Sequence, residues 1–206
     1  MAKSGEKIGA QAEIYDREAL EIVTPYVDKM RREDLDYCLN AYREDFEAGN
    51  QALVAYVSQV LGLKTMIGVR VKEVEPGENV VQDDGLYWNK KKEVTIFHVK
   101  GQKPSLHKTI DTIAHELWHA KQHEEIEEGG ERAQVYREEF VHQIDPEKDY
   151  AGYRNQMIEQ EAFVFGRSVA ERAEATVRVR TKQEQVVSKG IGSKLKSLFG
   201  IGKNVA

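Results

Sequence analysis

The sequence predicts an α+β fold that is mostly helical, with a small β-sheet or hairpin beside one long helix. Apolar residues recur at helical spacing in three regions, residues 9–60, 105–127 and 150–179. Between the first two regions, residues 65–74 and 86–99 alternate apolar and polar side chains, which is typical of half-buried strands. Only four of the 206 residues are proline, so few positions interrupt the helices. A helical protein with a short strand-rich middle is therefore expected.

The elements follow from this pattern in chain order. Helices are expected up to about residue 60, and residues 65–74 are expected to form the first strand. A loop that ends in a tight turn at Asp84 and Gly85 leads into a hairpin over residues 86–99. The long helix begins at Ser105, whose hydroxyl suits an N-cap, and glycines at 129 and 130 end it. A short helix and then a long one, from about Tyr150 to Val179, complete the fold.

The composition of the chain indicates the cellular compartment to expect. The N-terminal residues contain no apolar core typical of a signal peptide, and no apolar run is long enough to cross a bilayer. Cys38 is the only cysteine, so an internal disulfide is excluded and a reducing compartment is expected. These observations favour a cytoplasmic protein.

Charge is distributed unevenly along the chain. The net charge is −5, but residues 177–206 carry seven basic residues and one acid, so this segment is +6 and the preceding residues are −11. The acidic body gives no reason to expect nucleic acid as a partner. We therefore divide the chain into an N-terminal helical region (1–63), a core (64–179) and a basic flexible or amphipathic tail (180–206).

A metal-binding motif lies in the long central helix. His115 and His119 are four residues apart, so their imidazoles lie one turn apart on one face and can bind the same ion. The apolar stripe of this helix falls on the opposite face at about 100° per residue. Glu116 lies beside the first histidine, where its carboxylate can take a proton from a metal-activated water. His123 lies one turn further along, out of reach of an ion held by His115, and is expected at the surface or behind the ligands.

A third ligand has to come from another segment. Catalytic zinc commonly has three protein ligands and an open position, and the later helix offers Glu159 and Glu161. Helical projection places Glu161 within the apolar side of that helix and Glu159 nearly opposite. A buried acid is costly unless it is paired or bound to metal, so Glu161 is the predicted ligand. The alternative for Glu161 is a salt bridge to a basic residue such as Arg154 or Arg167, and Glu159 is expected to be a solvated surface acid.

Two segments carry a family resemblance. The sequence "TIAHELWHAKQ" (112–122), followed by "EQEAFVFG" (159–166), resembles the zincin metallopeptidases of the gluzincin type. More narrowly, it is similar to a small cytoplasmic bacterial and phage group that includes proteases cleaving phage-type repressors. The resemblance covers about residues 65–170 and implies a zincin-like minimal metallopeptidase fold, with Zn2+ held by His115, His119 and Glu161. The 41 residues between His119 and Glu161 exceed the shortest gluzincin spacing.

The implied activity is zinc-dependent peptide-bond hydrolysis with Glu116 as general base. His142, Tyr150 and Tyr153 are the candidates to donate a hydrogen bond to the oxyanion or the substrate. The strand over residues 93–99 is expected to pair with an extended protein or peptide substrate.

An alternative function stays open from the sequence. A zinc ion could be purely structural in a non-catalytic interaction module, and a closed four-ligand site would favour that interpretation. Residues 188–206 combine lysines with Leu195, Leu198 and Phe199, which share one helical face. The simplest interpretation of this segment is a solvated, unstructured terminus. The alternatives are docking on an anionic membrane or on an acidic partner, and docking on the acidic body of the protein itself.

Overall fold

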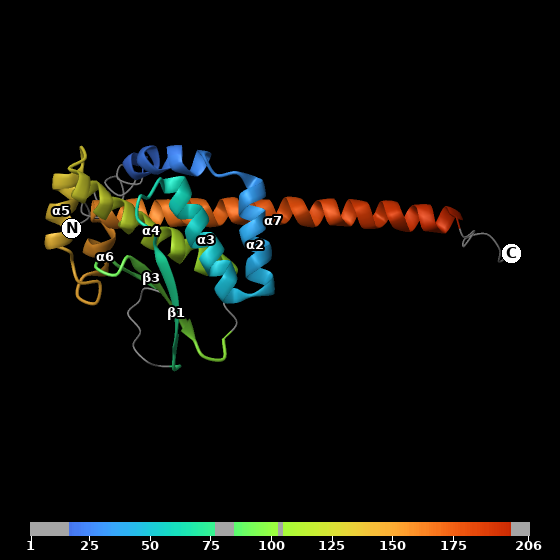
Figure 1. Cartoon of the computed structure of the whole chain (residues 1–206), viewed down its shortest axis with the longest axis horizontal. Helices are drawn as coiled ribbons and strands as arrows, with labels where there is room; N and C mark the ends of the chain where they lie inside the picture. Colours follow the sequence, from blue (N-terminus) through green and yellow to red (C-terminus); the bar gives the residue numbers. More distant parts are fainter. Residues whose placement is uncertain (1–16, 77–84, 103–104, 199–206) are drawn as a thin grey trace, which may run out of the picture.

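A computed structural model describes residues 17–76, 85–102 and 105–198, with side chains as far as residue 184 (Figure 1). It has the predicted α+β, mostly helical architecture. Residues 17–28 form a first helix, and the labelled elements follow it in chain order. They are α2 (Arg32–Glu44), α3 (Phe46–Leu61), β1 (Gly68–Val74), β2 (Gly85–Trp88), β3 (Glu93–Val99), α4 (Leu106–Glu128), α5 (Ala133–Val141), α6 (Tyr150–Arg154) and α7 (Met157–Leu198).

The three strands form one mixed sheet in the order β1-β3-β2. β3 pairs in parallel with β1 and antiparallel with β2, so the predicted hairpin is present and its turn lies between Trp88 and Glu93. This order corrects the expectation that residues 93–99 bind a substrate strand. β3 is the central strand and its hydrogen-bonding edges are both used within the sheet. Within the described residues, β2 is paired only on the side of β3.

The core lies where α4 crosses the other helices and the sheet. α4 packs along α7 and also contacts α3, α5, β2 and β3. Its apolar side chains Ile110, Ile113 and Leu117 are essentially inaccessible to solvent. Burying side chains of this size stabilises the fold by roughly 1.5–3 kcal/mol each. α4 is therefore rigidly held on several sides, which is what a helix that carries functional side chains requires.

The N-terminal helices belong to the same core. Buried side chains of residues 17–61, including Val23, Leu35 and Leu53, form one cluster with those of α4 and α7. Tyr26 packs edge-on against Trp118 of α4, with ring centroids 5.4 Å apart. Arg172 of α7 also donates a hydrogen bond to the carbonyl of Met30 at 2.7 Å. Residues 17–63 of the predicted N-terminal region thus contribute side chains to the same core as the described residues of 64–179.

The ends of the helices agree in part with the sequence. Ser105 caps α4 as predicted, and Gly129 ends it in the left-handed conformation that glycine adopts without strain. The helix predicted from Tyr150 is instead divided into α6 and α7, because the chain leaves helical geometry at Asn155 and Gln156. No helix in the described ranges combines the length and the apolar character needed to cross a membrane.

α7 is longer than predicted and projects beyond the body (Figure 1). Its backbone is helical as far as Leu198, whereas the sequence predicted a helix to about Val179 followed by a flexible or amphipathic tail. The contacts with the body reach Arg180, which pairs with Asp36 at 3.0 Å, and Gln183, which accepts a weak hydrogen bond from Arg32. The last residues of the predicted amphipathic segment, 199–206, lie outside the described residues.

Candidate metal centre

Two imidazoles project from α4 on the side away from its apolar stripe. His115 and His119 are each 8% exposed, and their Nε2 atoms lie 3.2 Å apart. The ring of His115 is held edge-on by Phe163 of α7, and the ring of His119 lies near Phe140 of α5. The two ring nitrogens therefore converge at fixed positions, as the spacing of the motif predicted.

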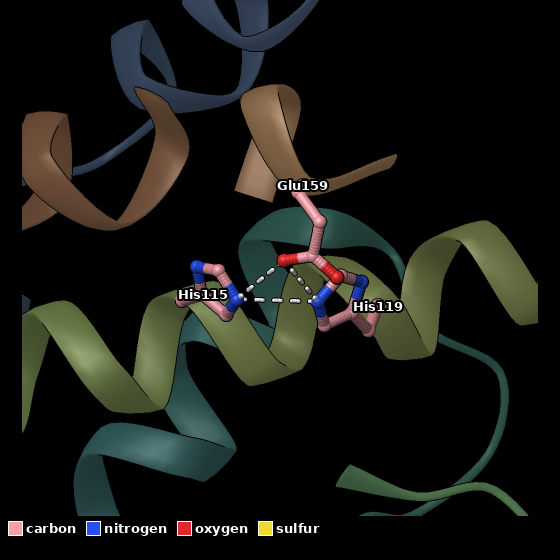
Figure 2. A group of neighbouring side chains, drawn as sticks. All are labelled: His115, His119 and Glu159. Atoms are coloured by element: carbon pink, nitrogen blue, oxygen red, sulfur yellow. Dashed lines mark hydrogen bonds and ion pairs between the residues drawn. The ribbon is translucent and has the colours of Figure 1, made fainter. Parts of the chain in front are cut away.

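A carboxylate of α7 completes a triangle with these nitrogens. Oε2 of Glu159 lies 3.4 Å from Nε2 of His115 and 3.6 Å from Nε2 of His119 (Figure 2). Glu159 is fully buried, and this oxygen has no hydrogen bond of regular geometry among the described residues. The other oxygen, Oε1, accepts a hydrogen bond from the side-chain amide of Gln143 at 2.9 Å. One carboxylate oxygen is therefore anchored while the other faces the histidines.

The triangle matches the ligand geometry of a zinc site. In a tetrahedral site with bonds of about 2.0–2.1 Å, neighbouring ligand atoms lie roughly 3.3 Å apart. The three sides measured here are 3.2, 3.4 and 3.6 Å. Two imidazoles and one carboxylate are also a donor set that suits zinc. Within the described part of the chain, this is the group of histidine and acidic side chains that fits a metal ion.

Glu161 lies elsewhere, which corrects its predicted position. Its carboxylate forms an ion pair with Arg132 at 2.5 Å and accepts hydrogen bonds from the indole of Trp118 at 3.1 Å and the hydroxyl of Tyr136 at 2.8 Å. The salt bridge considered as the alternative for Glu161 is therefore present, but its partner comes from the segment between α4 and α5. The structure brings Glu159, not Glu161, to the two histidines.

The reason for the difference is that the first turns of α7 are buried on two sides. Ile158, Ala162 and Phe165 face the apolar core, as the projection predicted. The opposite side, which was expected to be solvated, faces the pocket and α4 instead. Glu159 is therefore 0% exposed although it lies opposite the apolar stripe.

One sequence signal does identify the site face of α7. Glu159, Phe163 and Gly166 follow one another at i, i+4 and i+7, so they share a helical face. A Cβ atom at Gly166 would lie 2.7 Å from the carbonyl oxygen of Asp111 and 3.4 Å from Cβ of His115. The absent side chain lets α7 approach α4 beside the first histidine. In the sequence, Gly166 lies about two turns after Glu159 within a predicted helix, and a glycine at such a position indicates a close contact with another element.

The charges of the site are strongly coupled. Burial by itself would lower the pKa of His119, but the close negative charge of Glu159, with the nearby charge of Glu116, raises it to about 9. Burial likewise opposes ionisation of Glu159, yet both histidines hold the pKa of this carboxylate well below its usual range. Glu159 and His119 therefore each favour the charged form of the other. A cation in the triangle would take the place of a proton on His119 as the partner of Glu159.

Glu116 faces the same pocket from the next position of α4. It is 5% exposed, and its Oε2 accepts a hydrogen bond from the backbone amide of Tyr87 at 2.8 Å. A Cβ at Gly85 would overlap the side chain of Thr112 and lie 3.4 Å from Cγ of Glu116, so glycine is needed for β2 to run this close to α4. The edge strand thus fixes the carboxylate of the predicted general base.

The triangle of His115, His119 and Glu159, called the metal triangle below, lies in the wall of a pocket of about 400 Å³. β2 forms one side, and residues 143–146 between α5 and α6 form the other. His123, predicted at the surface or behind the ligands, lines the pocket and stacks on Phe140 with ring centroids 4.2 Å apart. Burial, with repulsion from charged His119 and Lys92, lowers the pKa of His123 to about 4. The ring of His123 is therefore neutral at pH 7 and forms an uncharged part of the pocket lining.

The three predicted oxyanion or substrate residues lie in different surroundings. Tyr153 is buried and lines the pocket, which is consistent with its predicted role. His142 forms the C-cap of α5 and does not line the pocket. Tyr150 is 48% exposed at the start of α6 and is also absent from the lining. Of the three, Tyr153 is the one that the fold brings to the site.

Comparisons with models of protein families, with curated proteins and with solved structures find no match for this chain.

Proposed function

We propose that the protein is a zinc-dependent peptidase whose metal ligands are His115, His119 and Glu159. The observation that carries this proposal is the triangle of two imidazole nitrogens and one carboxylate oxygen, with sides of 3.2 to 3.6 Å. These three side chains would hold the ion, which when bound would polarise a carbonyl group and acidify water. Three protein ligands in the wall of a pocket leave room for substrate, which favours a catalytic over a purely structural site.

Glu116 is proposed to act as the general base. It follows a ligand directly on α4, lines the pocket and is ionisable. Its carboxylate would take a proton from the attacking water and pass it to the leaving amine. The backbone amide of Tyr87 holds one carboxylate oxygen in place, so the base does not need to reorient during the reaction.

The proposed substrate is an extended peptide bound along β2. Gly85, Leu86 and Tyr87 of this strand line the pocket, and within the described residues the far edge of β2 carries no strand partner. A peptide could add to this edge by main-chain hydrogen bonds to groups other than the N–H of Tyr87, which donates to Glu116. The exposed side chains of Leu86 and Trp88 would then offer apolar contacts. This assignment moves the substrate strand from β3, where the sequence placed it, to β2.

Metal analysis combined with one substitution tests the proposal. Purified protein is expected to contain about one zinc per chain and to cleave members of a peptide library. Glu116→Gln should keep the zinc and the fold while lowering turnover by at least about 100-fold, the usual contribution of a general base. Glu127→Gln provides the matched control, because Glu127 lies on the same helix but is half-exposed and pairs with Lys92.

The outcomes separate the two functions that the sequence left open. Zinc with hydrolysis that depends on Glu116 supports the peptidase. Zinc without hydrolysis of any peptide supports the non-catalytic interaction module. Unchanged turnover in Glu116→Gln would remove this residue from the mechanism, and a wild-type protein that binds no zinc would reject both.

A further inference from the structure

A buried chain of polar groups runs from the surface to the far side of the metal triangle. Nδ1 of His119 lies 2.9 Å from Oε1 of Gln122, which is 1% exposed. Nε2 of Gln122 donates to the carbonyl of Ile158 at 3.0 Å and to Oε2 of Glu161 at 3.2 Å. Glu161 in turn pairs with Arg132, whose side chain is 24% exposed. The chain therefore begins at a partly solvated guanidinium and ends on a proposed zinc ligand.

The donors and acceptors along this chain can be assigned without ambiguity. A carbonyl and a carboxylate are both acceptors only, so the two hydrogens of the Gln122 amide must point toward Ile158 and Glu161. The amide oxygen must then face His119. That oxygen can only accept, so Nδ1 of His119 must carry a hydrogen. In the neutral imidazole, the lone pair is consequently on Nε2, the atom that faces His115 and Glu159.

We propose that Glu161 is a positioning residue that acts through Gln122 to select the metal-binding tautomer of His119. This inference deepens the proposed function, since it rests on Nε2 of His119 as a ligand atom. It also gives Glu161 a role different from the ligation expected from the sequence. Histidine ligands generally need a partner for the second ring nitrogen, because that partner fixes both tautomer and ring orientation.

The surroundings of Glu161 explain why a charged group at this position is tolerated. The side chain is 0% exposed, and burying an unpaired carboxylate would be very costly. Arg132 supplies a positive charge, while Trp118 and Tyr136 each donate a hydrogen bond to Oε2. Burial and the negative charge of Glu161 raise the pKa of Tyr136, so its hydroxyl remains a donor. Every partner of Glu161 is a donor, and the carboxylate accepts from each of them. It therefore also acts as an acceptor toward Gln122.

Replacing the carboxylate by an amide weakens this selection. In Glu161→Gln the new amide group can donate as well as accept, so only the carbonyl of Ile158 still requires a hydrogen of the Gln122 amide. The flipped amide, which presents its hydrogens to His119, then becomes populated. In that fraction Nδ1 has to accept, and the hydrogen moves to Nε2, where it blocks the metal. Gln122→Met breaks the chain differently, because a thioether of similar length cannot fix the imidazole. Both changes should weaken zinc binding by roughly 10- to 100-fold, the usual effect of losing such a partner.

Gln156→Met is the matched control. Gln156 is also buried, but its amide bonds to the backbone of His142 and Ile144 rather than to a metal ligand. It therefore reports the general cost of replacing a buried glutamine. Its zinc affinity should stay within about 3-fold of wild type.

The experiment combines zinc affinity, measured by competition with a chelator, with long-range 1H–15N spectra of the histidine rings. The spectra are recorded on metal-free protein over a series of pH values, and the tautomer is determined at the pH values where the ring of His119 is neutral. We expect the Nδ1–H tautomer of His119 in wild type and Gln156→Met, and a mixture or the Nε2–H form in Gln122→Met and Glu161→Gln.

An Nε2–H tautomer in the wild type overturns the inference, and so does a fully unchanged Nδ1–H tautomer in Glu161→Gln, whatever the result for Gln122→Met. The wild-type spectrum can overturn the inference even if a variant fails to fold. If wild type shows the Nδ1–H tautomer but binds no zinc, the proposed function fails while the assignment of the hydrogen-bond chain stands.

Discussion

Glu159 and Glu161 are two residues apart on α7 and both are fully buried, yet their carboxylates contact different sets of groups. Glu159 approaches His115 and His119 to 3.4 and 3.6 Å, whereas Glu161 is held by Arg132 and three hydrogen-bond donors. Two residues correspond to a turn of about 200° around a helix, so the two side chains leave α7 in nearly opposite directions. One therefore reaches the pocket, and the other contacts Gln122 and Arg132.

The different positions predict different losses of zinc affinity. Glu159→Gln should weaken zinc binding by more than the roughly 10- to 100-fold expected for Glu161→Gln, because it removes a proposed ligand rather than a supporting group. Chelator competition on both purified variants measures the order. If Glu161→Gln proves the more damaging change, the ligand assignment made from the sequence is the better one.

The helical pattern predicted the elements of the fold more reliably than it predicted which side of α7 carries the proposed ligand. The motif in α4 needs only local geometry, since His115 and His119 share a face of any straight helix. The third ligand depends on which elements cover α7. Residues 143–146 and α4 bury its polar side at Glu159, and no local pattern describes that tertiary arrangement. An amphipathic projection assumes a single buried side, and here there are two.

The order of the strands in the sheet could not be predicted from the sequence either. Alternation within residues 93–99 identified a strand, but both edge and central strands can alternate. The parallel pairing of β1 with β3 is a contact between distant segments, and it makes β3 central. The exposed residues of β2, Leu86 and Trp88, alternate with buried Gly85 and Tyr87. This alternation is compatible with an edge strand but does not by itself require one.

Gly166→Ala should destabilise the protein by about 1–2 kcal/mol. The new methyl group would overlap Asp111, whose backbone carbonyl lies 2.7 Å from the Cβ position, and overpacking of this kind costs roughly 1–3 kcal/mol. The higher helix propensity of alanine offsets up to about 1 kcal/mol of that cost. Because α7 would move away from α4 beside His115, zinc affinity should fall as well. Chemical denaturation and chelator competition measure the two effects.

Arg167→Ala is the control for this prediction, since Arg167 is the next residue of α7 and is exposed. Its unfolding free energy should stay within about 0.5 kcal/mol of wild type. A Gly166→Ala variant as stable as this control would show that α4 and α7 do not need their close approach.

His123→Phe should make the protein less sensitive to acid. The pKa of His123 in the folded protein is about 4, against an ordinary value of about 6.5. Between these values the unfolded chain binds a proton that the folded chain excludes, so wild-type stability falls as the pH is lowered from about 6.5 to about 4. Phenylalanine keeps the stacking on Phe140 and cannot bind that proton.

The measurement is the unfolding free energy of both proteins in denaturant at several pH values. Relative to its value at pH 7, the wild type should lose about 1 kcal/mol more than His123→Phe by pH 4.5, a figure reduced because part of the ring is exposed. Parallel pH profiles for the two proteins would show that His123 titrates normally in the folded state.

Deleting residues 188–206 should leave folding and zinc binding intact while removing membrane binding. Side-chain contacts between α7 and the body reach Arg180 and Gln183 among the described residues, and the proposed ligands lie at or before Glu159. The unfolding free energy should therefore change by less than about 0.5 kcal/mol, and the zinc affinity by less than about 3-fold.

The deleted segment contains four lysines and no acid, interspersed with apolar residues. Full-length protein should float with anionic vesicles at low salt and not with neutral ones, whereas the truncated protein should remain at the bottom of the gradient in both cases. A truncated protein that is insoluble or free of zinc would place this segment in the core, and equal flotation of the two proteins would show that it does not dock on membranes.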